Sequence, residues 1–218
     1  MITMTKKRTE LVFLLDQSGS MAGLESDTIG GYNAFLQKQA AIEEPCLITT
    51  VLFDNSYQLL HDRIDIRAVS PLTEKDYRAG GSTALLDAMG QTMNKLIGIQ
   101  KRSSPDYQAD QVIFVVITDG MENSSRIYSP AEIKAMVEKQ EESYGWEFIF
   151  LGANIDAIVT AGSMGFRADR ALDYLADGEG TALNYKILSE TIGTFRTTGR
   201  VDQEGLNEIR RDVRERGN

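Results

Sequence analysis

The sequence is poor in cysteine, histidine and basic residues, and each shortage excludes a class of protein. It contains one cysteine among 218 residues, so an intramolecular disulfide is excluded. Lysine and arginine number 23 against 32 aspartates and glutamates, which gives a formal net charge of −9. Generic binding to nucleic acid or to anionic membranes requires clustered basic residues, so we expect neither here.

Long apolar runs are also missing. No segment approaches the roughly 20 apolar residues that span a bilayer. Residues 1–10 include Lys6, Lys7 and Arg8 and lead into an apolar run that is too short for the hydrophobic region of a signal peptide. The lone thiol, Cys46, lies in the apolar run 46–53, where we expect a buried core residue in a reducing compartment. We therefore expect a soluble, cytoplasmic protein.

The sequence does contain a regular alternation of apolar runs and helical patterns. The expected strands cover residues 11–15, 46–53, 57–61, 112–117, 146–151 and 171–174. One expected helix follows a cap at Ser26 or Asp27, and another begins at Thr83. Two more begin at Ser129, with a capping box, and at Asp156, and a fifth includes the stretch from Leu183 to Phe195. This order predicts an α/β fold: a Rossmann-like, doubly wound, mostly parallel sheet with one antiparallel edge hairpin strand and helices on both faces.

The length and the 42% hydrophobic content suit one sizeable core rather than two. We assign one domain to residues 8–199 and a charged, helical C-terminal appendage to residues 200–218. In the appendage, Leu206, Ile209 and Val213 share one helical face. This pattern fits a solvated helix that rests on the domain, with a partner-docking helix as the alternative.

Three short polar segments carry the chemistry. They are DQSGS at residues 16–20, GGST at residues 80–83 and TDG at residues 118–120. Asp16 and Asp119 lie just past the carboxyl ends of the two most strongly apolar strands. Open α/β sheets bind ligands beyond the carboxyl ends of strands, where the strand order reverses. The best polar cluster of the sequence is therefore expected at the usual ligand site of this architecture.

The donor atoms in these segments predict the kind of ion. Asp16, Ser18, Ser20, Thr83 and Asp119 all offer hard oxygen ligands, without thiolate or imidazole. This set suits Mg²⁺, with Mn²⁺ or Ca²⁺ as alternatives, and disfavours Zn²⁺ and copper. Two carboxylates roughly neutralise a divalent ion. If some of the five residues act through water, one coordination position stays open for an acidic residue of a partner.

These five residues resemble the metal-ion-dependent adhesion site of von Willebrand factor type A domains. The resemblance covers residues 8–175 and includes all five motif positions in order. It implies that Ser18, Ser20 and Thr83 bind the metal directly, that Asp16 and Asp119 act largely through water, and that a ligand carboxylate completes the site. The intracellular character resembles bacterial and phage-type members, including those near tellurite-resistance systems. The implied function is a non-enzymatic, metal-dependent protein-binding module.

Other residues receive lesser roles. We expect a partner-binding rim made of Gln17, Ser82, Met121, Glu122 and Asn123. Asn154 and Asp156 are secondary rim candidates for which helix capping is the alternative. We expect no catalytic role for His61 and a core position for Trp146.

Three other functions compete with the binding module. The first is a Mg²⁺-dependent phosphatase or phosphotransferase with Asp16 as nucleophile; haloacid-dehalogenase-like enzymes begin this way, but they carry a second acid where this chain has Ser18. The second is a structural subunit whose metal only stabilises loops. A serine hydrolase is disfavoured, because no G-x-S-x-G motif occurs. For each motif residue, ordinary turn or capping chemistry is the simpler alternative, such as Thr83 as a helix cap.

Overall fold

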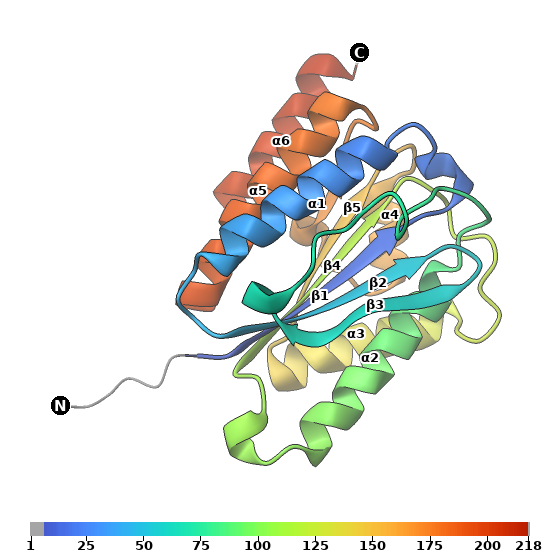
Figure 1. The fold of residues 1–218 in the computed structure, drawn as a ribbon. Coiled ribbons are helices and arrows are strands. Elements are labelled where there is room, and N and C mark those ends of the chain that lie inside the picture. Colours follow the sequence, from blue (N-terminus) through green and yellow to red (C-terminus); the bar gives the residue numbers. More distant parts are fainter. Residues whose placement is uncertain (1–6, 218) are drawn as a thin grey trace.

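Six strands form one sheet in the part of the chain that the computed structural model describes, residues 7–217 (Figure 1). Residues 1–6 of the N-terminal segment and residue 218 of the appendage lie outside the described residues. The strands are β1 Thr9–Asp16, β2 Cys46–Phe53, β3 Tyr57–Asp65, β4 Gln111–Thr118, β5 Glu147–Gly152 and β6 Ala171–Asp173. The order across the sheet is β3-β2-β1-β4-β5-β6, and only β3 runs antiparallel to its neighbour. The predicted fold class is confirmed.

The two central strands are buried along their whole length. Every residue of β1 and of β4 is buried, because helices cover both faces of the sheet at its centre. This explains why both strands read as continuous apolar runs rather than as alternating patterns. The chain proceeds from β1 to β2 in one direction and from β4 to β5 in the other, so the strand order reverses between β1 and β4.

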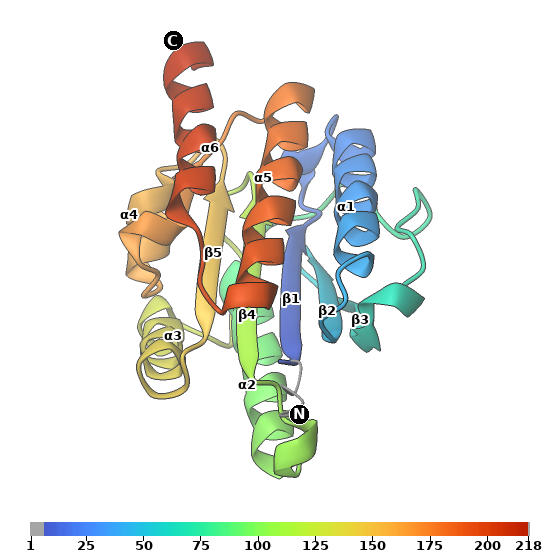
Figure 2. The same ribbon diagram turned by 90° about the vertical axis from the view of Figure 1, so that its left-hand side faces the viewer.

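The helices form one layer on each face (Figure 2). They are α1 Glu25–Ala40, α2 Leu85–Arg102, α3 Pro130–Tyr144, α4 Ala157–Ser163, α5 Gly178–Thr198 and α6 Gln203–Arg216, with 3₁₀ turns at Gly19–Met21, Ile66–Ala68, Pro105–Tyr107 and Ala168–Arg170. Helices α1, α5 and α6 share one hydrophobic core with the sheet, and α2, α3 and α4 share the other. Within the described residues, no helix is both long and apolar enough to cross a membrane.

The predicted helix starts are confirmed at α3 and α4, where polar side chains cap the helix. Ser129 accepts a hydrogen bond from the Glu132 amide, and the Glu132 carboxylate accepts one from the Ser129 amide, which is the predicted capping box. Asp156 caps α4 as expected. The predicted cap at Ser26 or Asp27 is wrong: α1 begins at Glu25 after Leu24, which has no capping side chain and is held by burial in the core.

The C-terminal helices are joined to the domain by buried contacts. Leu206 and Ile209 of α6 lie in the core that α6 shares with α5, while the opposite face of α6 is charged and exposed. Arg196 of α5 is fully buried, and its guanidinium donates to the backbone oxygens of Gln39 at 2.6 Å and Glu44 at 2.5 Å. These bonds satisfy carbonyl groups at and beyond the end of α1, where helical partners are lacking.

Candidate metal centre

The loop after β1 is organised by the carboxylate of Asp16. Asp16 ends the strand and is completely buried. Its Oδ1 accepts a hydrogen bond from the Ser18 amide at 2.6 Å, and its Oδ2 accepts one from the Thr118 hydroxyl at 2.5 Å. The hydroxyls of Ser18 and Ser20 then lie 2.9 Å apart. Asp16 thus connects its own loop to β4 and holds the Ser18 backbone, and the Ser18 hydroxyl contacts that of Ser20.

The loop that carries Thr83 is fixed to the first loop by its backbone. Gly19 donates to the Gly81 oxygen at 3.0 Å, and Gly80 donates to the Gln17 oxygen at 2.8 Å. Gly81 has a φ of +76°, and a Cβ there would lie 2.2 Å from the side-chain oxygen of a neighbouring asparagine, so this turn requires glycine. The two loops form one rigid unit.

Thr83 is held from the other side by the loop after β4. The Thr83 amide donates to Asn123 Oδ1 at 2.9 Å, and the Asn123 amide donates to the Thr83 oxygen at 3.0 Å. Helix α2 begins two residues later, with Ala84 at the cap position. Thr83 is therefore not the helix cap, and the capping alternative for this residue is wrong.

Three hydroxyl groups converge at Gly120. A Cβ placed on Gly120 would lie 2.7 Å from Thr83 Oγ1, 2.9 Å from Ser20 Oγ and 3.3 Å from Ser18 Oγ. The space between these hydroxyls exists because Gly120 has no side chain. Three of the five predicted ligands, from two loops, therefore face one small cradle.

The neighbouring carboxylate, Asp119, is buried and incompletely paired. Only 4% of the residue is exposed, and its Oδ1 has no hydrogen-bond partner among the described residues. Its Oδ2 lies 3.4 Å from the donating side-chain amide of Asn154, whose φ of 55° is in the left-handed region. A buried carboxylate oxygen without a partner is costly, and a bound cation would remove that cost.

The electrostatics of Asp16 point the same way. Burial raises the pKa of Asp16 above its ordinary value, and the charge of Asp119 raises it further, although hydrogen bonds from Thr118 and Ser18 lower it. Two carboxylates in one buried site repel each other unless a positive charge separates them. Three features fit a hard divalent cation: the hydroxyl cradle, the Asp119 oxygen that has no hydrogen-bond partner, and the closeness of the Asp16 and Asp119 carboxylates.

The donor set differs from a histidine or cysteine site. Across residues 7–217, no group of three or more histidine, cysteine, aspartate and glutamate side chains is placed to hold a metal. A cation here would depend on serine and threonine hydroxyls as much as on the two carboxylates. The preference for Mg²⁺ over Zn²⁺ stays a prediction from these oxygen donors.

The predicted rim residues have different surroundings. Met121 is 70% exposed beside the site, Ser82 is half-buried and Gln17 is buried. The Glu122 carboxylate accepts hydrogen bonds from the amides of Leu86, Ser124 and Ser125 and from the Ser125 hydroxyl. Glu122 and Asn123 thus hold the loop after β4 against the start of α2, and Met121 and Asn123 are the exposed rim candidates.

Three residues outside the motif contribute to the site. Thr118 donates a hydrogen bond to the Asp16 carboxylate, and Asn154 donates one to the Asp119 carboxylate. The Tyr77 hydroxyl donates to the backbone oxygen of Asp16 at 2.5 Å. The sequence could have indicated the role of Thr118, because this residue lies at the end of an apolar strand, one residue before Asp119. It gives no indication of the Tyr77 contact, which depends on how a long connection folds over the sheet.

Two other singled-out residues lie in different surroundings. His61 is buried in β3 next to the Tyr32 hydroxyl, and burial lowers its pKa. Trp146 stacks on Phe114 in the core, as predicted.

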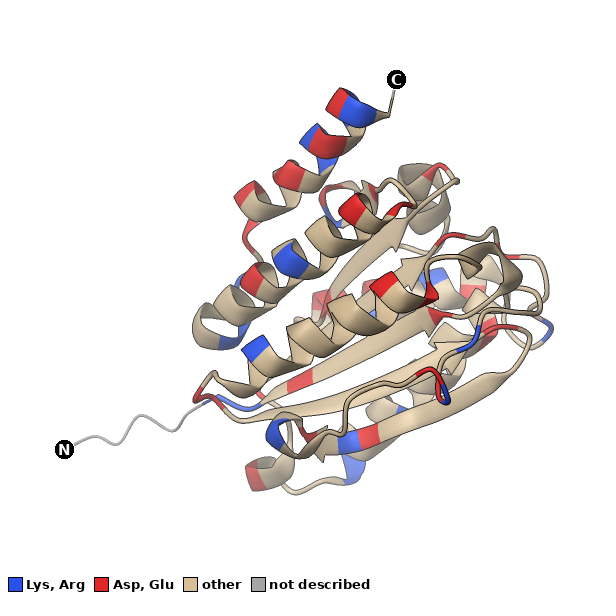
Figure 3. Ribbon diagram, turned by 45° about the horizontal axis from the view of Figure 1, so that its top comes forward, with Lys and Arg blue, Asp and Glu red and all other residues tan. Residues whose placement is uncertain are grey.

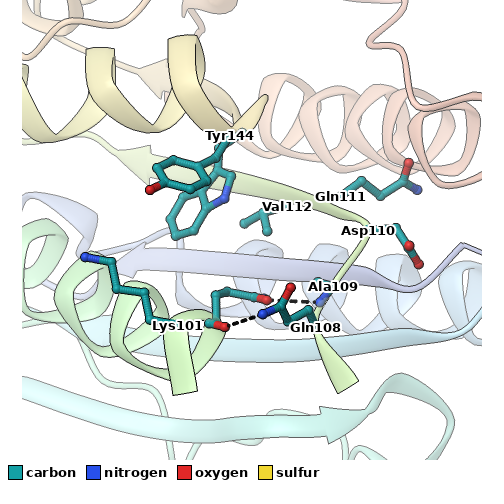
Figure 4. Close-up of a pocket in the computed structure, with 9 residues that line it drawn as sticks. Lys101, Gln108, Ala109, Asp110, Gln111, Val112 and Tyr144 are labelled. Atoms are coloured by element: carbon teal, nitrogen blue, oxygen red, sulfur yellow. Dashed lines mark hydrogen bonds between the residues drawn. The ribbon is translucent and has the colours of Figure 1, made fainter. Parts of the chain in front are cut away.

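A separate cavity of about 250 Å³ lies at the amino ends of the strands. Its walls include Lys101 at the end of α2, Val112 at the start of β4 and Tyr144 at the end of α3 (Figure 4). These residues come from the edge of the sheet opposite to Asp16 and Asp119. The cavity is therefore no part of the candidate metal centre.

Comparison with known proteins identifies the fold. No family model and no curated protein matches the sequence. Among solved structures, it is similar to a von Willebrand factor type A protein from Catenulispora acidiphila, with a TM-score of 0.58, 15% identity and coverage of 85% of this chain and 42% of that one. The PilB minor pilin from Streptococcus sanguinis gives a TM-score of 0.58, 11% identity and coverage of 87% and 62%.

A third similar structure is the manganese-loaded TRAP protein of Plasmodium vivax, with a TM-score of 0.50, 22% identity and coverage of 67% of this chain and 57% of that one. The chain spans less than two thirds of the length of each of these three proteins. The similarity defines the class of fold. The chain has a von Willebrand factor type A-like fold.

Proposed function

We propose that this chain is a protein-binding module that depends on a divalent cation. Asp16, Ser18, Ser20, Thr83 and Asp119 hold the ion, and an acidic side chain of a partner protein binds to it. Mg²⁺ is the proposed ion, and the same oxygen donors accept Mn²⁺ or Ca²⁺.

One observation carries the proposal: three hydroxyls face a cradle at Gly120, next to a buried carboxylate oxygen of Asp119 that has no partner. Turn or capping chemistry explains neither feature, because Thr83 caps nothing and an unpaired carboxylate stabilises no turn. The manganese-loaded state of the similar TRAP structure supports the choice of a divalent ion. The similarity to a pilin and to a von Willebrand factor type A protein supports a role in protein binding.

A bound cation would supply a positive charge that attracts a carboxylate. The hydroxyl ligands are neutral and only two carboxylates surround the ion, so an acidic group from outside meets less repulsion than it would at a site with four carboxylates. In this chain, Asp16 and its partners Ser18 and Thr118 orient the loops before any partner arrives. Met121 offers an apolar contact beside the site.

We propose no enzymatic activity. Both oxygens of Asp16 already accept hydrogen bonds, from the Ser18 amide and the Thr118 hydroxyl, which lowers the reactivity of the carboxylate as a nucleophile. Ser18 stands where the phosphatase alternative needs a second acid. With Mg²⁺ present, we expect no hydrolysis of p-nitrophenyl phosphate. Turnover that Asp16→Asn abolishes would instead establish the phosphatase alternative.

The decisive experiment is calorimetric titration of Mg²⁺, Mn²⁺ and Ca²⁺ into metal-stripped protein. We expect one ion to bind to the native chain and to bind undetectably to Asp16→Ala and Thr83→Ala, with native circular dichroism in both variants. Asp106→Ala, at an exposed position in the turn after α2, is the matched control and keeps binding. Equal binding by the native chain and Asp16→Ala would refute the site.

A second measurement separates the binding module from a purely structural metal. Free acetate or glutamate is expected to change the binding heat of Mg²⁺, or the spectrum of Mn²⁺ in a Mn²⁺-loaded sample, because the open position accepts a carboxylate. A metal that raises the melting temperature but never accepts a carboxylate would support the structural alternative.

A cytoplasmic location and kinship with bacterial or phage-type members, including those near tellurite-resistance systems, stay predictions from the sequence.

A further inference from the structure

A groove of about 300 Å³ lies between helices α2 and α3. Both helices begin at the carboxyl edge of the sheet and end at its amino edge, so they run in the same direction. Near the ends of the two helices, Lys101 and Tyr144 line this groove and also the cavity of about 250 Å³ described above (Figure 4). None of the groove residues belongs to the candidate metal centre.

The groove carries positive charge in a chain that is strongly negative overall. Acidic and basic positions are interspersed over much of the ribbon (Figure 3). The groove differs from this mixture, because Lys101 of α2 and Lys139 of α3 line it and no aspartate or glutamate does. It therefore attracts anions locally, although the chain as a whole has a net charge of −9.

The two lysines in the groove differ from the other lysines of the same helices. Lys95 of α2 forms an ion pair, and so does Lys134 of α3. Lys101 and Lys139 are exposed, and within residues 7–217 their ammonium groups have neither an ion-pair nor a hydrogen-bond partner. Both ammonium groups are thus available to a carboxylate from another molecule.

Apolar side chains lie beside the lysines. On α2, Ile97 precedes Lys101 by four positions, and on α3, Met136 precedes Lys139 by three, so each apolar residue lies about one helical turn, or about 5.4 Å, from a lysine on the same face. Ile97 and Met136 are partly buried against the core below. Because the helices run in the same direction, both lysines lie on the amino-edge side of the apolar residues. The groove has an apolar half and a positive half.

The polar atoms of the lining favour a peptide as the occupant. Asn94 of α2 lines the groove, and its side-chain N–H donates to the Tyr128 hydroxyl at 2.8 Å, so its Oδ1 remains an acceptor for a backbone N–H. A nucleic-acid backbone offers no such donor, gains little from aliphatic contacts and carries a charge at every nucleotide, which the net charge of the chain opposes. A peptide with one acidic and one aliphatic side chain matches both halves of the groove.

We infer that the groove between α2 and α3 is a second protein-binding site, which takes a short extended segment of a partner with an aliphatic and an acidic side chain two positions apart. Such side chains lie on one face of an extended segment, roughly 6.5–7 Å apart, which is close to one helical turn. The aliphatic group contacts Ile97 and Met136, and the carboxylate contacts Lys101 and Lys139. Binding here needs no metal, so this site and the proposed metal centre fail or succeed independently.

The test is selection of a random short-peptide display library on the full chain in EDTA, which removes any contribution of a metal. We expect the selected peptides to be enriched in aspartate or glutamate two positions from leucine, isoleucine or valine. Fluorescence anisotropy with a labelled selected peptide then measures affinity, which is expected to fall as salt is raised. The double variant Lys101→Glu/Lys139→Glu, with native circular dichroism, is expected to bind at least about tenfold more weakly.

Matched variants give each outcome a meaning. Lys134→Glu/Lys186→Glu makes the same change in charge at exposed positions outside the groove, and its affinity is expected to stay within about threefold of the native value. Asp16→Ala is expected to bind the peptide as the native chain does. Met136→Ser is expected to weaken binding while preserving the salt dependence.

Three results would overturn the inference. The first is a selection without enrichment in acidic residues. The second is a double variant of the groove lysines that binds no more weakly than the variant with the matched charge change. The third is a single-stranded oligonucleotide or laurate that binds more tightly than the selected peptide through the same lysines.

Discussion

Replacement of Gly120 by alanine places a methyl group where the three hydroxyls of the candidate metal centre meet. The new carbon would lie 2.7 Å from Thr83 Oγ1 and 2.9 Å from Ser20 Oγ, whereas ordinary contacts begin at 3.4 Å. The Thr83 oxygen must therefore move by about 0.7 Å, the difference between 3.4 and 2.7 Å. Metal–ligand distances tolerate only about 0.2 Å.

This displacement sets the expected magnitude. Gly120→Ala removes at least one direct ligand and blocks the cradle, so we expect Mg²⁺ affinity to fall at least about a hundredfold, or about 2.7 kcal/mol. The backbone of Gly120 is not in the left-handed region, so alanine causes no backbone strain there. The loss of stability in the metal-free protein is expected to stay at about 1–2 kcal/mol from local crowding.

The assay is calorimetric titration of Mg²⁺ together with urea unfolding in EDTA. Gly80→Ala is the matched control, because it lies in the same pair of loops, has no positive φ and would place its Cβ more than 4 Å from any other group. We expect the control to bind Mg²⁺ like the native chain. Native affinity in Gly120→Ala would refute the argument that the three hydroxyls hold the ion.

Three further predictions concern other parts of the molecule. Asn154→Gly keeps the left-handed backbone but removes the amide that contacts Asp119, and we expect about tenfold weaker Mg²⁺ binding by calorimetry; unchanged affinity would show that Asn154 does not orient the carboxylate. Arg196→Ala removes the buried guanidinium that donates to the backbone oxygens of Gln39 and Glu44 and should cost about 3 kcal/mol in urea unfolding, whereas a loss below about 1 kcal/mol would contradict this role. Burial, and then the charge of Glu147, raise the pKa of Glu141 to about 7. Because the folded pKa is above the ordinary 4.5, the folded state favours the protonated acid, and stability is lost as pH rises from about 4.5 to about 7. Glu141→Gln should reduce this loss by about 1 kcal/mol, since the carboxyl is only half-buried; an identical pH profile would refute the assignment.

The sequence was sufficient for the sheet because its central strands carry the strongest signals. Residues 112–117 are continuously apolar and rich in valine and isoleucine, and a run of this length favours a buried strand over a helix. The start of α3 was predictable for a similar reason, since its capping box consists of residues three positions apart. Short-range signals therefore located both the strands and the polar residues at their ends.

Features that depend on packing between distant segments were not predictable. Helix α1 starts after Leu24, which is buried and has no polar capping side chain. Glu122 was expected at a partner-binding rim, but its carboxylate is engaged by amides of the α2 start and of its own loop. The contact of Asn154 with Asp119 joins loops that follow different strands. A single sequence does not reveal which of several polar loop residues will meet.

The pairing of β1 with β4 has a consequence for the order of events in folding. Asp16 and Thr118 are bonded across strands that lie about 100 positions apart in the chain, and such long-range parallel pairing forms slowly. A partly folded chain that lacks this pairing also lacks the cradle, so a cation has nothing to bind until the chain has nearly reached its native topology. We therefore expect a bound ion to slow unfolding while leaving the folding rate almost unchanged. Occupancy of the site would thus stabilise the native state kinetically.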